Sequence, residues 1–246
     1  MKILHTSDWH LGHRLHEQSQ YEEQSQFLAW LETYIKSEEV SVLLVSGDVF
    51  DTGVPSTQSQ KMYYDFLIKL AHSSCKHVVI TGGNHDAPGT INAPKALLSA
   101  LQVQVVGKVT ENVSDEVFKL SVGDEQVIVA AVPYMRDQDI RRAVAGESFD
   151  DIGDRYKMAL VNHYTEVGAY CESLKTEHVP VIGMGICLPL AVLHRRVSRV
   201  FMWEAWVILV LMIFLRFSII WLWVICIALK RQGEPIIFAI RVHPPS

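Results

Sequence analysis

The stretch VLLVSGDVFD, residues 42–51, decides the fold. It begins with four consecutive aliphatic residues, the pattern of a short strand that is buried on both faces. Gly47 and Asp48 follow the strand, and a glycine at that point allows the backbone to turn sharply. A buried strand that ends in a carboxylate is typical of α/β enzymes, whose sites form at the carboxyl ends of parallel strands.

The same pattern occurs once before and once after this stretch. Apolar runs at residues 3–6 and 78–80 each precede a short polar cluster, and helical spacing of apolar residues fills the intervals between the runs. This alternation predicts βαβ units around a mostly parallel sheet. Farther on, two apolar segments flank Gly123-Asp124 and predict a hairpin in a second, antiparallel portion, while residues 154–174 predict a helix.

Each of the three strand ends carries side chains that can bind metal ions. Carboxylate, imidazole and amide donors without thiolate suit manganese, iron or zinc in a hydrolytic site. A carboxylate such as Asp48 can bridge two cations, and cations about 3.5–4 Å apart can activate water for an in-line displacement at phosphorus. One cluster alone would usually be a turn or a surface pair, but the order and strand-end placement of all three predict a single site. The clusters are Asp8-Trp9-His10, Gly47-Asp48-Val49-Phe50-Asp51 and Gly83-Asn84-His85-Asp86.

Together these clusters resemble the signature of the calcineurin-like metallophosphoesterases. The opening ILHTSDWHLG, the phrase SGDVFDTG and the later VPVIGMG are similar, more narrowly, to the SbcD group of DNA-repair nucleases. The resemblance covers residues 1–185 and implies an α/β sandwich of two mixed sheets flanked by helices. Because the family continues with further motifs, we expect this nuclease domain to be incomplete at its C-terminal side.

The resemblance also assigns a metal-binding role to four residues. Asp8 and His10 would bind the first metal, and Asp48 would bridge the two metals. Asn84 would bind the second metal. The cofactor that the resemblance implies is a pair of divalent ions, usually Mn²⁺.

Two further residues gain a catalytic role from the same resemblance. His85 would contact the scissile phosphate and help to protonate the leaving oxygen, and Asp86 would orient it. The implied activity is single-strand endonuclease and double-strand 3′–5′ exonuclease cleavage of DNA. The implied partners are DNA, a second copy of the nuclease chain, and an SMC-like ATPase of the SbcC type in a heterotetramer. His163 lies inside a predicted helix, so we expect it to be structural or solvated.

Three histidine ligands that the resemblance predicts are missing. Ile186 and Cys187 follow Gly185 where the resemblance predicts His-Leu, and no Gly-His-x-His motif comes later. Loss of one base in the codon for Gly185 would explain both departures. The displaced reading frame permits Gly-His-Leu at residues 185–187 and Ala-Leu-Gly-His-x-His at residues 221–227. Residues 186–246 would then be an out-of-frame, apolar tail without partner strands.

A transmembrane segment is the alternative interpretation of residues 206–229, which are long and apolar enough to span a bilayer. Arg216 near the middle would oppose insertion by roughly 2.5–3.5 kcal/mol. The spanning segment explains only the length of the apolar run, whereas the frameshift also predicts the recovered motifs. We therefore favour the frameshift.

Composition limits the remaining possibilities. The net charge of −5 argues against an autonomous nucleic-acid binder, although an enzyme that holds DNA through metals and a partner is compatible with it. The chain reaches Asp8 before any apolar run of signal-peptide length builds up, and its four cysteines contain no Cys-x-x-Cys pair, so we expect no signal peptide and a cytoplasmic protein. An inactive fragment and a phosphatase of the same superfamily stay open as alternatives.

Overall fold

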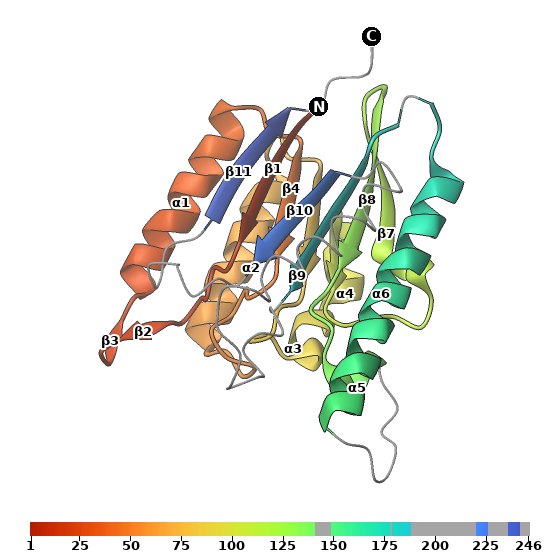
Figure 1. The fold of residues 1–246 in the computed structure, drawn as a ribbon. Coiled ribbons are helices and arrows are strands. Elements are labelled where there is room, and N and C mark those ends of the chain that lie inside the picture. The colour runs from red at the N-terminus through yellow and green to blue at the C-terminus, as the bar shows by residue number, and fades with distance from the viewer. Residues whose placement is uncertain (141–148, 178, 188–219, 226–235, 242–246) are drawn as a thin grey trace.

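The computed structural model describes residues 1–140, 149–177, 179–187, 220–225 and 236–241. Two sheets pack face to face, with helices α1 and α2 covering one sheet and helix α6 covering the other (Figure 1). The predicted α/β sandwich of two mixed sheets is therefore confirmed. The helices are α1 (Tyr21–Ser37), α2 (Thr57–Ala71), α3 (Pro88–Asn92), α4 (Lys95–Ala100), α5 (Asp137–Ile140) and α6 (Phe149–Leu174), with a 3₁₀ turn η1 (Val113–Glu116).

The first sheet has the strand order β11-β1-β4-β5-β6. Its central strands are parallel, and Ser46 at the end of β4 pairs with both Ser7 and Thr81 at the ends of β1 and β5. The polar clusters that follow these strands consequently begin side by side. The strands are β1 (Lys2–Ser7), β4 (Val42–Ser46), β5 (His77–Thr81), β6 (Val103–Val106) and β11 (Ile236–Arg241), and β2 (Arg14–Leu15) and β3 (Gln18–Ser19) form a separate hairpin.

The second sheet has the order β10-β9-β8-β7 and contains the predicted hairpin. Its strands β8 and β9 are parallel, so the sheet is mixed and not purely antiparallel. The predicted helix begins at Phe149, earlier than the apolar spacing indicated. The strands are β7 (Val117–Val122), β8 (Glu125–Val132), β9 (Val181–Cys187) and β10 (Ile220–Ile225).

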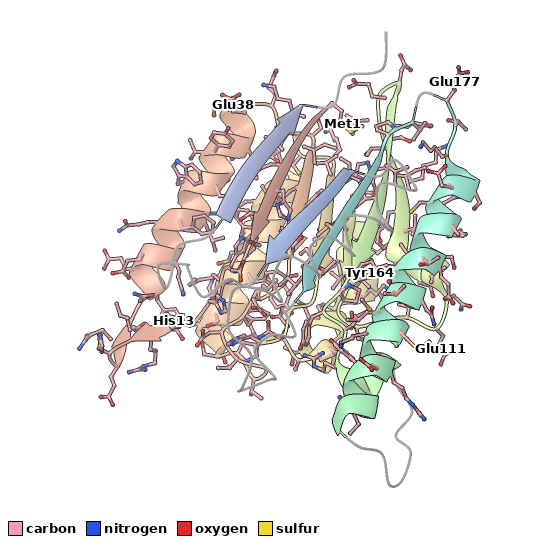
Figure 2. All side chains as sticks on the ribbon, viewed as in Figure 1. Met1, His13, Glu38, Glu111, Tyr164 and Glu177 are labelled. Atoms are coloured by element: carbon pink, nitrogen blue, oxygen red, sulfur yellow. The ribbon has the colours of Figure 1, made fainter. Side chains whose placement is uncertain are left out.

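Three apolar layers hold the sandwich together. The middle layer lies between the sheets and includes Ile3 and Val79 from the first sheet and Val129 and Met184 from the second. The other faces of the sheets pack against the helices, so the central strands are buried on both sides, as their continuous apolar runs predicted. Figure 2 shows Tyr164 on α6, where its ring packs on the second sheet.

His163 has the structural role that the sequence predicted. Its Nε2 lies 2.8 Å from a carboxylate oxygen of Glu116, which is fully buried in η1. The same carboxylate accepts hydrogen bonds from the main-chain N–H and the hydroxyl of Thr110. A buried carboxylate requires such partners, so this contact fixes α6 against η1.

The expectation that the apolar tail lacks partner strands is wrong at two places. Strand β10 pairs in parallel with β9, and strand β11 pairs antiparallel with β1. Within the described ranges, no helix combines the length and the apolar character needed to cross a bilayer. Of the candidate spanning run, residues 206–219 and 226–229 lie outside the described residues. The same holds for most of the predicted out-of-frame tail, which stays a prediction.

Candidate metal centre

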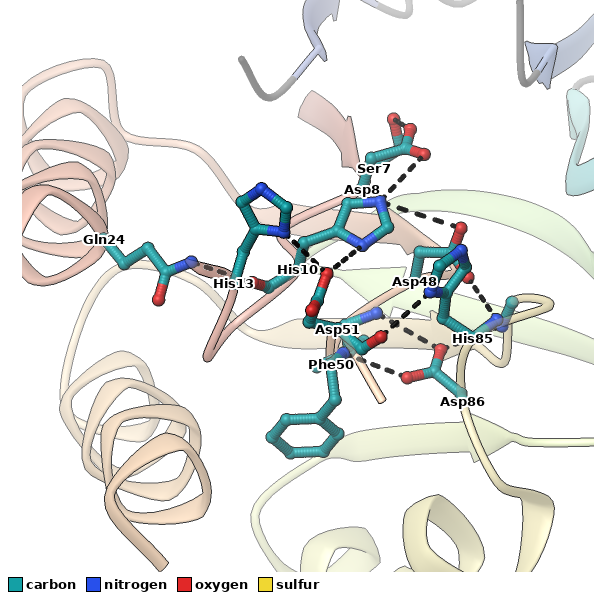
Figure 3. A network of polar contacts seen from close by, with 12 residues as sticks. Ser7, Asp8, His10, His13, Gln24, Asp48, Phe50, Asp51, His85 and Asp86 are labelled. Carbon is teal, nitrogen blue, oxygen red and sulfur yellow. Dashed lines mark hydrogen bonds and ion pairs between the residues drawn. The ribbon is translucent and has the colours of Figure 1, made fainter. Parts of the chain in front are cut away.

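The three polar clusters meet at the carboxyl ends of β1, β4 and β5 in the first sheet (Figure 3). His10 Nε2 lies 3.9 Å from Asp8 Oδ1 and 3.9 Å from Asp48 Oδ2, and ligand atoms of these three residues all lie within 4.8 Å of one another. Ligand atoms roughly 2.0–2.2 Å from one shared ion would lie about 3–3.5 Å apart, so the three side chains would have to move closer to bind it. The donor types suit a divalent cation, and the three side chains are close enough to form a candidate site for one.

The backbone at these positions adopts an unusual conformation. Asp8, His10 and Asp48 have φ angles of 54°, 45° and 47°, in the left-handed region that residues other than glycine seldom adopt. Each such residue stores strain that the surrounding structure has to offset, and such residues cluster at functional sites. All three donors of the candidate metal group share this feature, which the sequence motifs alone did not reveal.

Gly83 is required because the loop after β5 lies against the loop after β4. A Cβ atom on Gly83 would lie 2.1 Å from Asp48 Oδ1 and 2.3 Å from the Asp48 nitrogen, which is too close for any side chain. The next residues of the same loop are Asn84, which is half-buried, and His85, which is exposed. The main-chain N–H of His85 donates to Asp48 Oδ1 at 2.9 Å. Asp48 thus holds the loop that carries Asn84 and His85.

Asp86 also links the loop after β4 to the loop after β5. Its carboxylate is buried and accepts main-chain hydrogen bonds from Gly83 at 2.9 Å, Phe50 at 3.0 Å and Val49 at 3.2 Å. Burial raises the pKa of this carboxyl, and the N–H groups of Gly83 and Phe50 partly oppose that shift. The carboxylate is therefore directed at the main chain of both loops.

The ring of His85 has a different partner from the one that the resemblance suggested. Its Nδ1 lies 2.9 Å from the main-chain oxygen of Asp51. A carbonyl oxygen can only accept, so this contact places the proton on Nδ1 and leaves Nε2 for another ligand. In this structure the group that orients the His85 ring is thus Asp51 O, while Asp86 binds the main chain.

Asp51 and His13 belong to the site, although the motif analysis gave neither a role. Asp51 Oδ1 lies 3.0 Å from His13 Nδ1 and 3.4 Å from His10 Nδ1. A carboxylate beside the second nitrogen of a metal-binding imidazole fixes the orientation of the ring. The second aspartate of the Gly-Asp-x-x-Asp pattern was the sequence signal for Asp51. His13 had no comparable signal.

His5 lies beneath the site on β1, where it is fully buried. Its Nε2 lies 2.8 Å from Ser46 Oγ at the end of β4. Burial lowers the pKa of His5 to about 4, and the nearby Asp8 carboxylate only partly opposes this. His5 is consequently neutral at pH 7 and supports the strand ends as a hydrogen-bonding group, not as a charge.

Comparison with known proteins agrees with this arrangement. Residues 1–157 match the family model of the calcineurin-like phosphoesterases. The chain belongs to the calcineurin-like phosphoesterases. This family is metal-dependent, and Asp8, His10 and Asp48 form a candidate metal-binding group in this member.

Several curated relatives are named as the SbcD component of the nuclease SbcCD. The chain is 30% identical over 186 residues to the protein from Escherichia coli K12, which covers 75% of this chain and 46% of that protein. It is 32% identical over 163 residues to the Bacillus subtilis 168 protein, covering 65% of this chain and 41% of the relative. The Rhodobacter capsulatus protein is 35% identical over 148 residues, covering 57% and 36%. The chain thus spans less than half the length of the relatives that it matches.

An aliphatic side chain borders the phosphoesterase site on the side of the second sheet. A Cβ atom on Gly47, whose φ is 62°, would lie 2.1 Å from Cδ1 of Ile186. Ile186 is buried near the end of β9, at the position where the motif comparison expects a histidine. The fold therefore brings this position next to Gly47, beside Asp48 of the candidate metal group, but the residue present cannot bind a metal.

Gly83→Ala should lower Mn²⁺ affinity by roughly 10–100-fold, the range typical for changes that displace a metal ligand from its support. The added methyl group would overlap Asp48 Oδ1 and separate the two loops. Titration of Mn²⁺ followed by electron paramagnetic resonance measures the effect. Gly89→Ala is the matched control, since a Cβ atom there meets nothing within 4 Å. Equal affinities in the two variants would contradict the inferred contact between the loops.

Proposed function

We propose that this chain carries the catalytic fold of a DNA phosphodiesterase that works with two divalent ions, with Mn²⁺ as the metal. The observation that supports this most is the convergence of Asp8, His10 and Asp48 on one point, with the His85 ring beside it. The ring centroids of His10 and His85 are 4.9 Å apart. This distance supports the proposal that a metal-binding group and an exposed imidazole act on one phosphate.

The protein residues divide the work as follows in this proposal. Asp8 and His10 would hold the first metal, Asp48 would be shared, and Asn84 would hold the second. Bound divalent ions would neutralise phosphate charge and acidify a water molecule. His85 presents its Nε2 to a phosphate oxygen, because Asp51 O holds the opposite nitrogen in the protonated form. In the doubly protonated ring, Nε2 also carries a proton and can donate to that oxygen, and transfer of this proton to the leaving oxygen would complete the cleavage and return the ring to the neutral form protonated on Nδ1.

The names of the relatives support DNA as the substrate, since they describe a component of a nuclease. By similarity we propose single-strand endonuclease and double-strand 3′–5′ exonuclease activity in DNA repair, recombination and replication, in the cytoplasm. The partners would be an SbcC-type ATPase and a second copy of the nuclease chain, assembled as a heterotetramer. A net charge of −5 fits a chain that relies on metals and a partner to hold DNA.

We further propose that the activity of this chain is impaired. Ile186 occupies a place at the site where a ligand is expected, and a metal pair with fewer ligands is held weakly. An out-of-frame reading after Gly185 accounts for this residue and for the missing Gly-His-x-His motif. The competing functional class is an inactive or membrane-associated fragment, and the contact between Ile186 and Gly47 is the observation that favours inactivity.

Restoring one base in the codon for Gly185 should produce a manganese-dependent nuclease. In that protein His85→Ala should abolish cleavage and leave Mn²⁺ binding nearly unchanged, because His85 acts on the phosphate. The assay compares cleavage of single- and double-stranded DNA with hydrolysis of a p-nitrophenyl phosphate ester. Ester hydrolysis without DNA cleavage would indicate a phosphatase and refute the proposed substrate. Cleavage that persists in His85→Ala would remove the catalytic role of that residue.

A single substitution in the 246-residue chain should strengthen the site. Ile186→His places an imidazole next to Gly47 and Asp48, and we expect Mn²⁺ affinity to rise by about tenfold or more. Ile186→Gln is the matched control, since it adds polarity at the same position without an imidazole. Calorimetric titration of Mn²⁺ into each variant measures the difference. No gain for histidine over glutamine would show that this position lies outside the metal coordination sphere.

A further inference from the structure

Arg136 reaches from the second sheet to the metal-binding edge of the first. It follows β8 by a few residues, and its Nη2 lies 2.5 Å from the main-chain oxygen of Asp86. The same nitrogen lies 3.5 Å from the main-chain oxygen of Gly83, at the outer limit of a hydrogen bond. A single guanidinium thus faces the carbonyl groups at both ends of the Gly83–Asp86 turn.

A second contact from the same segment holds the beginning of this turn. The main-chain N–H of Tyr134 donates to Gly82 O at 2.8 Å. We name residues 134–136 the β8 strap and residues 82–86 the β5 loop. The strap therefore binds the loop through its main chain at Gly82 and through a charged side chain at Gly83 and Asp86.

The β8 strap is itself attached to helix α6. The hydroxyl of Tyr156 donates to the main-chain oxygen of Met135 at 2.7 Å, and the Met135 side chain is buried in the apolar layer under α6. The guanidinium of Arg136 also lies 5.8 Å from the centre of the Tyr134 ring, within the range of a cation–π contact. These contacts give the strap a fixed position from which Arg136 can hold the loop.

A charged donor on a main-chain carbonyl forms a stronger hydrogen bond than a neutral donor. The β5 loop depends on such support because its side chains have separate tasks. The His85 ring lies beside that of His10, Asn84 is the ligand that the proposed function assigns to the second metal, and Gly83 lies against Asp48 with no space for a methyl group. A small shift of this loop would change the placement of both functional side chains relative to Asp48.

We propose that Arg136 is a positioning residue, which holds the β5 loop through the carbonyl groups of Gly83 and Asp86 so that Asn84 and His85 face Asp48. Arg136 belongs to the strap that is attached to α6. The position of the β5 loop therefore depends on how α6 packs on the second sheet. This inference deepens the proposed function. Its test measures the loop itself and does not require metal or nuclease activity, so the two proposals can fail independently.

Hydrogen–deuterium exchange of the 246-residue chain without metal tests the role of Arg136. Loss of a charged hydrogen bond in Arg136→Gln should increase amide exchange in the β5 loop by roughly tenfold to a hundredfold, with exchange in β4 unchanged. Arg136→Lys retains a charged donor and should restore part of the protection. Arg14→Gln is the matched control, because Arg14 Nη2 also donates to a carbonyl oxygen, that of Glu17, in an exposed turn.

Tyr156→Phe provides a second variant that removes only one hydroxyl. It releases Met135 O, and we expect a several-fold increase of exchange in the β5 loop, smaller than in Arg136→Gln. Unchanged loop exchange in folded Arg136→Gln would overturn the proposal. Equal increases in the β5 loop and β4 would also overturn it, since they indicate a general loss of stability. If Arg136→Gln does not fold, an unchanged loop in Tyr156→Phe would overturn it.

Discussion

The contact between Gly83 and Asp48 is the constraint on which the rest of the site depends. Two strands that end in register bring their loops so close that no Cβ atom fits between Gly83 and the Asp48 carboxylate. The carboxylate then binds the main chain of His85, and Asp86 binds the loop after β4 in return. Each loop is thus held by a carboxylate on the other, and Asp48, which belongs to the candidate metal group with Asp8 and His10, lies on one of these two loops.

Most of the fold could be predicted because its central strands are buried on both faces. A strand such as β4 has to be continuously apolar, and its end has to turn, so residues 42–48 revealed both features. Helix α1 and helix α2 followed from apolar spacing on one face. The partners of β10 and β11 could not be predicted, because pairing between strands distant in sequence leaves little local signal.

The residues of the candidate site could be predicted from the sequence, but the contacts between them could not. Asp8, His10 and Asp48 were evident from their strand-end positions, and the structure brings them together. Their left-handed backbone and the partner of the His85 ring depend on distances that no motif encodes. Arg136 was missed because it acts across the two sheets on main-chain atoms, and residue patterns carry no signal for such a contact.

Paramagnetic broadening of histidine ring signals by Mn²⁺ determines whether the three strand-end clusters form one divalent-ion site. His77 is the first residue of β5, at the end of the strand away from the site, so its signal is an internal reference. We expect Mn²⁺ to broaden the His10 and His85 signals first and to leave His77 and His163 sharp at the same concentration. Equal broadening of all four signals, or selective broadening of His163, would contradict this expectation.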